Sequence, residues 1–139
     1  MNWSLIFLLS LFGLAMGAAT VFVIPSTIEP LVWLAIFGVC AYIIAVRCSR
    51  RYFLHGLMVS VVNSIWITAF HVLLFDRYII THNAEAEMML SMPLATSPRL
   101  LMSLMGPVIG VVSGIVLGLF AVGAHRLIGT GTKTAAPTL

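Results

Sequence analysis

Four long apolar runs, separated by short polar segments, constrain the fold more than any other feature of the sequence. They cover about residues 3–24, 27–46, 52–75 and 98–128. Each is near the ~20 residues that a helix needs to cross a hydrocarbon core of about 30 Å. Only 8% of the 139 residues are charged, whereas a soluble domain carries roughly a quarter. The sequence therefore predicts an all-α integral membrane four-helix bundle, with residues 1–128 as a single transmembrane domain.

Proline and capping residues mark the limits of the first two spans. Pro25 ends the first span, because proline lacks the N–H that a helix interior requires. Ser26, followed three residues later by Glu29, fits a capping box at the start of the second span, with Pro30 in its first turn. Small residues around Gly17 also resemble a signal-peptide cleavage site, but the usual basic segment before it is absent. We expect a retained first span, with cleavage as the alternative.

A short connection and two further prolines define the remaining spans. Only residues 47–51 join the second and third spans, so these two helices are expected to be antiparallel neighbours. Ser97 and Pro98 predict the N-cap and the first residue of the fourth helix. Pro107 lies inside that helix and predicts a kink, because it cannot donate the helical hydrogen bond. Residues 129–139 are small and polar, which predicts a disordered cytoplasmic tail.

The longest segment between spans, residues 76–98, contains most of the acidic residues. Within it, Asn83 is a favourable N-cap, and Glu85 and Glu87 follow in the first turn, where carboxylates stabilise a helix. A short helix is therefore expected over residues 83–90. Since apolar residues follow these acids, we expect the helix to lie at the outer membrane interface.

Basic residues indicate which side of the membrane faces the cytoplasm. Arg47, Arg50 and Arg51 lie in the second connection, and Arg126 and Lys133 follow the fourth span. By the positive-inside rule, these regions are cytoplasmic. The predicted location is the cytoplasmic (inner) membrane of a bacterium, crossed several times, with both termini inside. The basic residues are scattered rather than clustered, which argues against a nucleic-acid partner.

The fourth run repeats glycine at every fourth position. The glycines are Gly106, Gly110, Gly114 and Gly118. Residues four apart share a helix face, so they form a stripe about 18 Å long at ~1.5 Å per residue, which we call the glycine stripe. In lipid, helix association depends on close van der Waals contact, which such a groove permits. The expected partner is the GxxxG of the first span, Gly13 and Gly17, with another subunit or a pore as alternatives; Ser113 beside the stripe can add an interhelical hydrogen bond.

A second stripe, on the third span, is polar. Its members are Ser60, Ser64, Thr68 and His71, with Gly56 before them and Asn63 alongside. In a membrane these side chains must face protein or water. The first interpretation is that they bond across helices inside the bundle. The alternative is a hydrophilic path or a ligand site, with Asn63 and His71 as its main contacts.

Histidines and methionines raise the possibility of a bound metal. His55 and His125 are expected at similar depth near the cytoplasmic face, where a pair of histidines from facing helices can hold haem iron. Thioether sulfurs suit Cu(I), and five methionines gather towards the outer side: Met88, Met89, Met92, Met102 and Met105. An apolar packing role is the favoured interpretation for the methionines. Accordingly, we expect no cofactor, and haem or another metal stays an alternative.

No residues of the sequence form a recognisable catalytic constellation. Cys40 and Cys48 lie near one end of a span, which favours free thiols over a disulfide framework. We therefore expect a non-enzymatic small polytopic membrane protein: an oligomerising or accessory subunit, packed through the glycine stripe in a homo-oligomer or a larger membrane complex. A small transporter or channel that uses the polar face of the third span is the alternative, and a haem- or metal-binding membrane subunit is a third.

Overall fold

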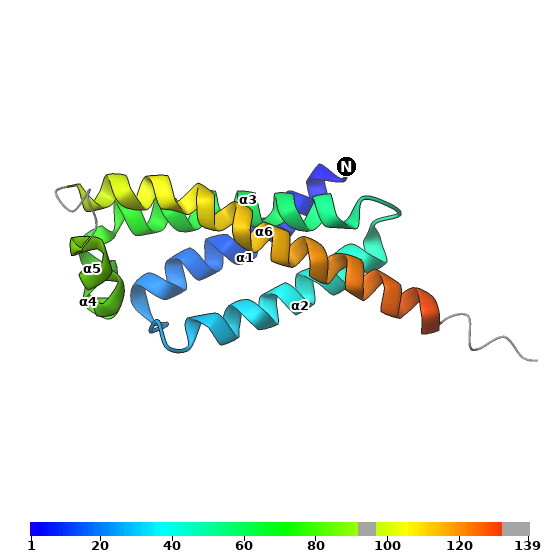
Figure 1. Cartoon of the computed structure of the whole chain (residues 1–139), viewed down its shortest axis with the longest axis horizontal. Helices are drawn as coiled ribbons and strands as arrows, with labels where there is room; N and C mark the ends of the chain where they lie inside the picture. The colour runs from blue at the N-terminus through cyan, green and yellow to red at the C-terminus, as the bar shows by residue number, and fades with distance from the viewer. Residues whose placement is uncertain (92–96, 132–139) are drawn as a thin grey trace, which may run out of the picture.

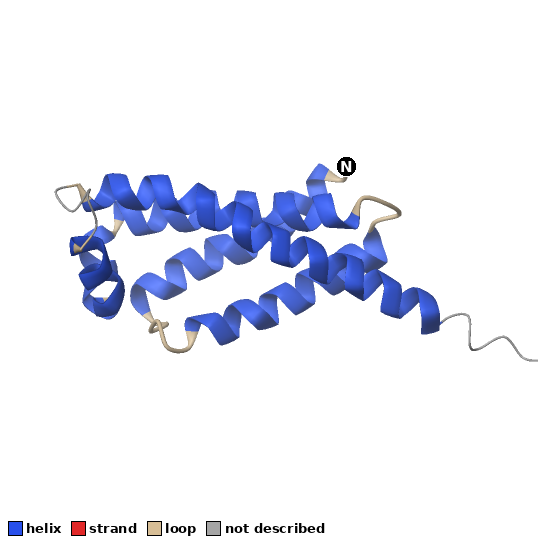
Figure 2. Cartoon of the chain, in the orientation of Figure 1, coloured by secondary structure: helices blue, strands red, loops and turns tan. Residues whose placement is uncertain are grey.

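The computed structural model describes residues 1–91 and 97–131, which fold into helices joined by short loops, with no strand in these two ranges (Figure 2). Four helices are long and apolar enough to span a membrane: α1 (Trp3–Phe22), α2 (Glu29–Arg47), α3 (Tyr52–Leu73) and α6 (Pro98–Gly131). Two short helices, α4 (Phe75–Thr81) and α5 (Asn83–Leu90), lie between α3 and α6 in the sequence (Figure 1). The all-helical fold and its four candidate membrane spans are confirmed.

Helix α3 is the central element, because both α6 and α1 pack along it. Helix α2 packs mainly against α6 and has few contacts with α3, although the turn between α2 and α3 is short. That turn reverses the chain at Arg51, whose φ of 58° lies in the left-handed region. Figure 1 shows that the C-terminal end of α2 lies near α6 and that the two helices diverge towards Glu29 at the start of α2.

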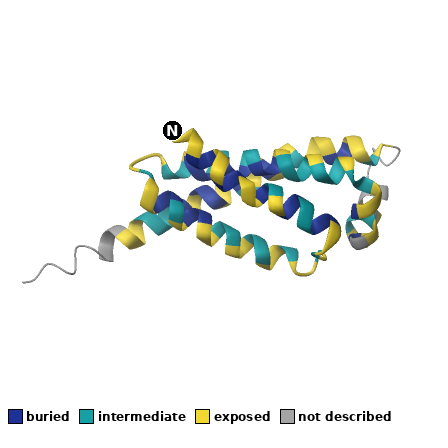
Figure 3. Cartoon of the chain, turned by 180° about the vertical axis from the view of Figure 1, so that it is seen from behind, coloured by how far each residue is buried: buried dark blue, intermediate teal, exposed yellow. Residues whose placement is uncertain are grey.

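Two apolar clusters hold the helices together. The larger lies where all four long helices meet, and its members are Leu5, Ile6, Leu9, Cys40, Ala41, Ile44, Val59, Leu117 and Ala121. The smaller joins Val21 of α1, Tyr78 of α4 and Met102 of α6. Outside these clusters, many large apolar side chains are exposed along the outer faces of the helices (Figure 3). A continuous exposed apolar surface of this kind is suited to lipid.

The start of α2 differs from the predicted capping box. Residues 26–28 form turns, α2 begins at Glu29 itself, and Ile28 occupies the N-cap without a side-chain hydrogen bond. The Glu29 carboxylate instead accepts a hydrogen bond from Trp33 Nε1 at 3.2 Å. The predicted capping box is therefore wrong, because Glu29 bonds forward to Trp33 within α2 rather than back to an N-cap. Pro30 lies in the first turn of α2, as predicted.

The segment between α3 and α6 contains one helix more than the sequence predicted. Helix α3 ends at Leu73, and α4 begins at Phe75 after a break at Leu74 (φ −108°, ψ 31°). Helix α4 packs against α1. Helix α5 has the predicted bounds, although Asn83 is its first residue rather than its N-cap.

Helix α6 begins at Pro98, as predicted, and is unbroken through Pro107. It continues to Gly131, so residues 129–131, which were expected in a disordered tail, are helical. The rest of the predicted tail, residues 132–139, lies outside the described residues. At the other end of α6, Arg99 forms an exposed ion pair with Asp76 at 3.0 Å, which ties the start of α6 to α4.

Candidate functional site

The glycine stripe of α6 packs against α3. A Cβ on Gly106, Gly110, Gly114 or Gly118 would meet, respectively, Thr68, Ser64, Leu57 or Phe53 of α3. At Gly118 that Cβ would lie 2.8 Å from the backbone oxygen of Phe53. The helices also meet at Gly56 of α3, whose Cβ would lie 2.7 Å from Cα of Gly118. The prediction that the stripe packs against Gly13 and Gly17 of α1 is therefore wrong.

The physical reason is that α3 presents its own small residues to the stripe. Gly56, Ser60, Ser64 and Thr68 recur at intervals of four, so they lie on one face of α3 and fit the groove on α6. The predicted interhelical hydrogen bond of Ser113 is confirmed, with Ser60 Oγ 2.8 Å from Ser113 Oγ. Helix α3 therefore packs along the glycine stripe, while Gly106 and Gly110 also line the cavity between α2, α3 and α6.

The glycines of α1 pack on a different face of α3. A Cβ on Gly13 would lie 2.7 Å from Cα of Asn63, and one on Gly17 would lie 3.2 Å from Cα of Ile67. The Gly13 N–H donates to Asn63 Oδ1 at 3.2 Å, which fixes the orientation of the amide. Asn63 is 2% exposed, and its Nδ2 has no hydrogen-bond partner among the described residues. A buried donor without a hydrogen-bond partner lowers the stability of the folded state by about 1–3 kcal/mol.

A cavity of about 660 Å³ lies between α2, α3 and α6, with α4 and α5 at one end. All members of the predicted polar path line it: Ser60, Asn63, Ser64, Thr68 and His71. The remaining wall is mainly apolar and aromatic. At its narrow end α2 meets α6 through Phe37 and Phe120, whose ring centroids are 6.5 Å apart. The volume lies within the ~300–1,000 Å³ of typical small-molecule sites.

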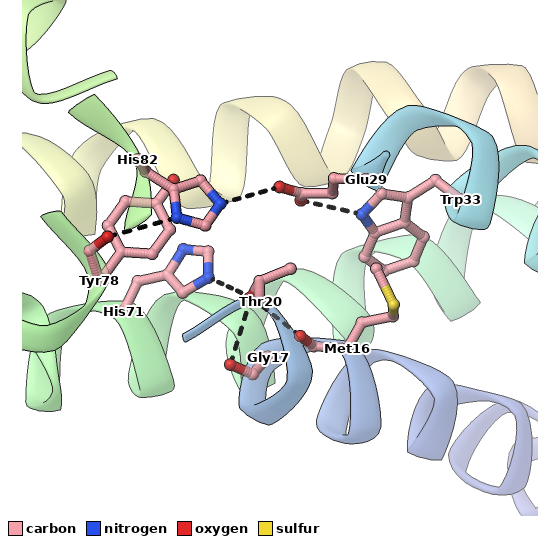
Figure 4. A network of polar contacts seen from close by, with 8 residues as sticks. All are labelled: Met16, Gly17, Thr20, Glu29, Trp33, His71, Tyr78 and His82. Carbon is pink, nitrogen blue, oxygen red and sulfur yellow. Dashed lines mark hydrogen bonds and ion pairs between the residues drawn. The ribbon is translucent and has the colours of Figure 1, made fainter. Parts of the chain in front are cut away.

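A network of polar contacts lies at the end of the cavity near α4 and α5 (Figure 4), and Glu29, Trp33, His71 and Tyr78 of this network line the cavity. Glu29 accepts from Trp33 on one side and lies 3.4 Å from Nε2 of His82 on the other. The rings of His82 and Tyr78 stack with centroids 4.2 Å apart, and those of Tyr78 and His71 at 4.1 Å. This network joins α2, α3, α4 and His82 at this end of the cavity.

Hydrogen bonds determine which ring nitrogens carry protons. Nδ1 of His82 lies 3.3 Å from the carbonyl oxygen of Tyr78, which can only accept, so Nδ1 donates. The contact between His82 Nε2 and Glu29 Oε2 is then attractive only when one of them also carries a proton. The Thr20 hydroxyl donates to the Met16 carbonyl at 2.9 Å. It therefore accepts from His71 Nε2 at 2.9 Å, which leaves Nδ1 of His71 as an acceptor.

The charged residues that line the cavity are acidic. Glu29 and Glu85 are among the described lining residues, which include no Lys or Arg. Oε2 of Glu85 is buried with no hydrogen-bond partner in the part of the chain that the structure describes. Burial raises the pKa of Tyr78, and the carboxylates of Glu29 and Glu85 raise it further. The Tyr78 phenol therefore stays neutral at this electronegative end.

His55 and His125, the ligands of the alternative haem site, both make other contacts. Nε2 of His55 accepts from the Asn2 N–H at 3.0 Å, and Nδ1 donates to the Arg51 carbonyl at 2.9 Å, so both nitrogens are engaged. His125 stacks on Tyr52, with centroids 4.0 Å apart. Within the described residues, no three or more His, Cys, Asp or Glu side chains form a metal-binding group.

The two cysteines do not form a disulfide, and three of the methionines line the cavity. Cys40 is buried, Cys48 is half-buried, and both thiols are free. Met88, Met102 and Met105 line the cavity. Met92 and the side chain of Met89 lie outside the described residues.

Several residues of the site were not predicted from the sequence. Glu29 was interpreted as a capping residue, and Tyr78, His82 and Glu85 lie in the segment expected to connect the third and fourth spans. The available signal was a spacing of four between Glu29 and Trp33, which places a carboxylate and an indole on one helix face. No comparable signal links Glu29 with His82, because only the tertiary fold brings α2 to the loop between α4 and α5.

No known protein family matches the chain, and no curated protein or solved structure matches it significantly. The chemistry of the cavity is therefore the basis for a functional proposal.

Proposed function

We propose that the chain is a non-enzymatic, multi-pass membrane protein that binds a lipid-soluble ligand in the cavity between α2, α3 and α6. One observation carries the proposal: the polar residues predicted to form a path along the third span all line this cavity, whose wall is otherwise mainly apolar. Polar groups inside a membrane are expensive unless they are paired or functional. Asn63 Nδ2 has no partner among the described residues, so it is available to an acceptor atom of the ligand.

The position of the cavity supports entry from the bilayer. Leu34 of α2 and Ile109 of α6 line it and are 56% and 62% exposed, so both also contribute to the outer apolar surface. If α2 and α6 span the membrane, the opening between them faces lipid. In this proposal the four long helices form a transmembrane bundle, and α4 and α5 lie at its outer interface. The basic α2–α3 turn and both termini then face the cytoplasm of a bacterial cell.

His71, which lines the cavity, and His82 beside it support a binding role rather than catalysis. His71 donates to the Thr20 hydroxyl, which itself donates to a backbone carbonyl, so His71 does not act as a base towards that hydroxyl. His82 contacts a carboxylate. Neither arrangement produces an activated nucleophile. A transporter would use the same cavity and would differ by showing a flux that Asn63→Leu and His71→Leu abolish.

An accessory or oligomerising role remains a proposal, and it would use a surface other than the glycine stripe, because the stripe packs against α3. Native mass spectrometry of the full-length protein in a mild detergent measures subunit number and retained ligands in one spectrum. A monomer that retains a lipid-soluble molecule is the expected result.

The proposal is tested by filling the cavity. Val116 lines it and Val112 does not, although both lie on α6 and are partly exposed. The probe is triphenylphosphine oxide, a neutral apolar molecule with one strong acceptor, and calorimetry in detergent measures its binding. We expect saturable binding that Val116→Trp weakens at least ~10-fold, equivalent to about 1.4 kcal/mol, while Val112→Trp behaves as wild type. Absence of saturable binding, or equal effects of the two tryptophans, would contradict the proposal.

A further inference from the structure

We propose that the ligand of this cavity is a lipophilic cation, held with its positive charge against Glu29. This inference rests on the proposed function, since it concerns the chemistry of the molecule that the cavity accepts. It is carried by the charges, the aromatic rings and the unpaired atoms of the lining.

The first observation is the sign of the charge. Both carboxylates that line the cavity, Glu29 and Glu85, lie at its wide end, and the described lining includes no Lys or Arg. The nearby Arg99 forms its ion pair with Asp76, which is 83% exposed and does not line the cavity. In surroundings of low dielectric, like charges repel strongly and an anion requires a counter-charge. An anionic ligand is therefore excluded from this end, and a cation is complementary to it.

The second observation is the incomplete pairing of the carboxylates. Oε2 of Glu85 is buried and makes no hydrogen bond to any residue that the structure describes. Glu29 receives the Trp33 N–H, and its contact with His82 is attractive only with a proton between them. A neutral ligand would bring no positive charge to these oxygens. A ligand with a fixed positive charge supplies the counter-charge that Oε2 of Glu85 lacks among the described residues, and it adds a positive charge beside Glu29, whose other contacts are Trp33 and His82.

The third observation is the aromatic wall next to Glu29. The rings of Trp33 and Phe37 lie edge to face with centroids 5.9 Å apart, and Phe120 continues the wall. Aromatic faces attract cations, most strongly at desolvated sites. Met102 and Met105 add polarizable thioethers to the lining. An apolar body with a delocalised or shielded positive charge, such as an onium or a bulky ammonium ion, fits this combination.

The experiment compares probes of similar shape and different charge. Calorimetry in detergent measures the binding of tetraphenylphosphonium, of tetraphenylborate and of triphenylphosphine oxide to the full-length protein. We expect tetraphenylphosphonium to bind at least ~10-fold more tightly than the neutral probe, equivalent to about 1.4 kcal/mol. Tetraphenylborate is expected to show no saturable binding.

Variants of Glu29 test whether its carboxylate causes the preference for the cationic probe. Glu29→Gln keeps the size of the side chain and is expected to lower the affinity for tetraphenylphosphonium at least ~10-fold. Glu87 of α5 is exposed and does not line the cavity, so Glu87→Gln is the matched control that retains the wild-type preference. If Glu29→Gln does not fold, Glu85→Gln provides the same comparison at the second carboxylate.

The outcomes separate this inference from the proposed function. If the neutral probe binds as tightly as the cation, or if the Gln variants at Glu29 and Glu87 have equal effects, the cation inference is overturned while the cavity remains a binding site. If no probe binds, the proposed function fails. A cationic amphiphile that co-purifies and is displaced by tetraphenylphosphonium would support the inference and identify the source of the cation.

Discussion

At the scale of single residues, the glycines of α6 differ in what surrounds them. A Cβ on Gly118 would lie 2.7 Å from Phe53 Cδ2 and 2.8 Å from the Phe53 carbonyl oxygen, and a backbone atom cannot move away cheaply. Gly123, five residues later, has nothing within 4 Å of the same position. Two glycines of one helix therefore have opposite expected responses to an added methyl group.

We expect Gly118→Ala to destabilise the protein by about 1–3 kcal/mol through overpacking. Gly123→Ala should be neutral or stabilising by up to about 1 kcal/mol, because alanine favours the helix. Unfolding in a denaturing detergent, followed by circular dichroism, measures both free energies. Equal losses of stability would show that α6 does not approach α3 as closely as described.

Among the helices, α3 packs against α6 with one face and against α1 with another. Ser60, Ser64 and Thr68 meet the glycine stripe of α6, while Asn63 bonds to α1. His71 also bonds to α1, through Thr20. The side chains predicted as one polar stripe therefore divide between two helix interfaces. Their polar atoms hold these interfaces together and also line the cavity.

The hydrogen bond between Ser60 and Ser113 is a polar contact between α3 and α6 whose energy can be measured. Ser113 Oγ donates to the Ile109 carbonyl at 2.6 Å, so it accepts from Ser60. A double-mutant cycle with Ser60→Ala and Ser113→Ala should give a coupling energy of about 0.6 kcal/mol, typical of such bonds between membrane helices. A value near zero would mean that apolar packing alone holds this contact.

At the scale of the whole molecule, the two ends differ in chemistry. One end has the α2–α3 turn with its arginines, where Met1, Asn2, Cys48 and His55 lie around a small polar recess. The other end has the acidic cavity mouth under α4 and α5. In the proposed topology, which rests on the positive-inside rule, the arginine end faces the cytoplasm.

Cys48 provides a natural probe of this orientation. Cys40 is fully buried, whereas Cys48 is half-buried at the arginine end. A membrane-impermeant maleimide should label Cys48 in inside-out vesicles and leave right-side-out vesicles unlabelled, with Cys48→Ser as the control that abolishes labelling. Burial raises the pKa of Cys48, against a smaller lowering by the N-terminal ammonium, so labelling should accelerate as the pH rises. Labelling in right-side-out vesicles alone would reverse the proposed topology.

The sequence by itself determined the helical class, the four spans and the positions of Pro30 and Pro98, because run length and proline chemistry are local properties. It also determined that the glycines of α6 form a stripe and that the third span carries a line of polar residues. Only the tertiary structure decided which helix fills the groove, since α1 and α3 both offer small residues and the choice depends on how all four helices fit. The same holds for the cavity: Glu29, Tyr78 and His82 come from separate segments, and their chemistry depends on a proximity that no local spacing contains.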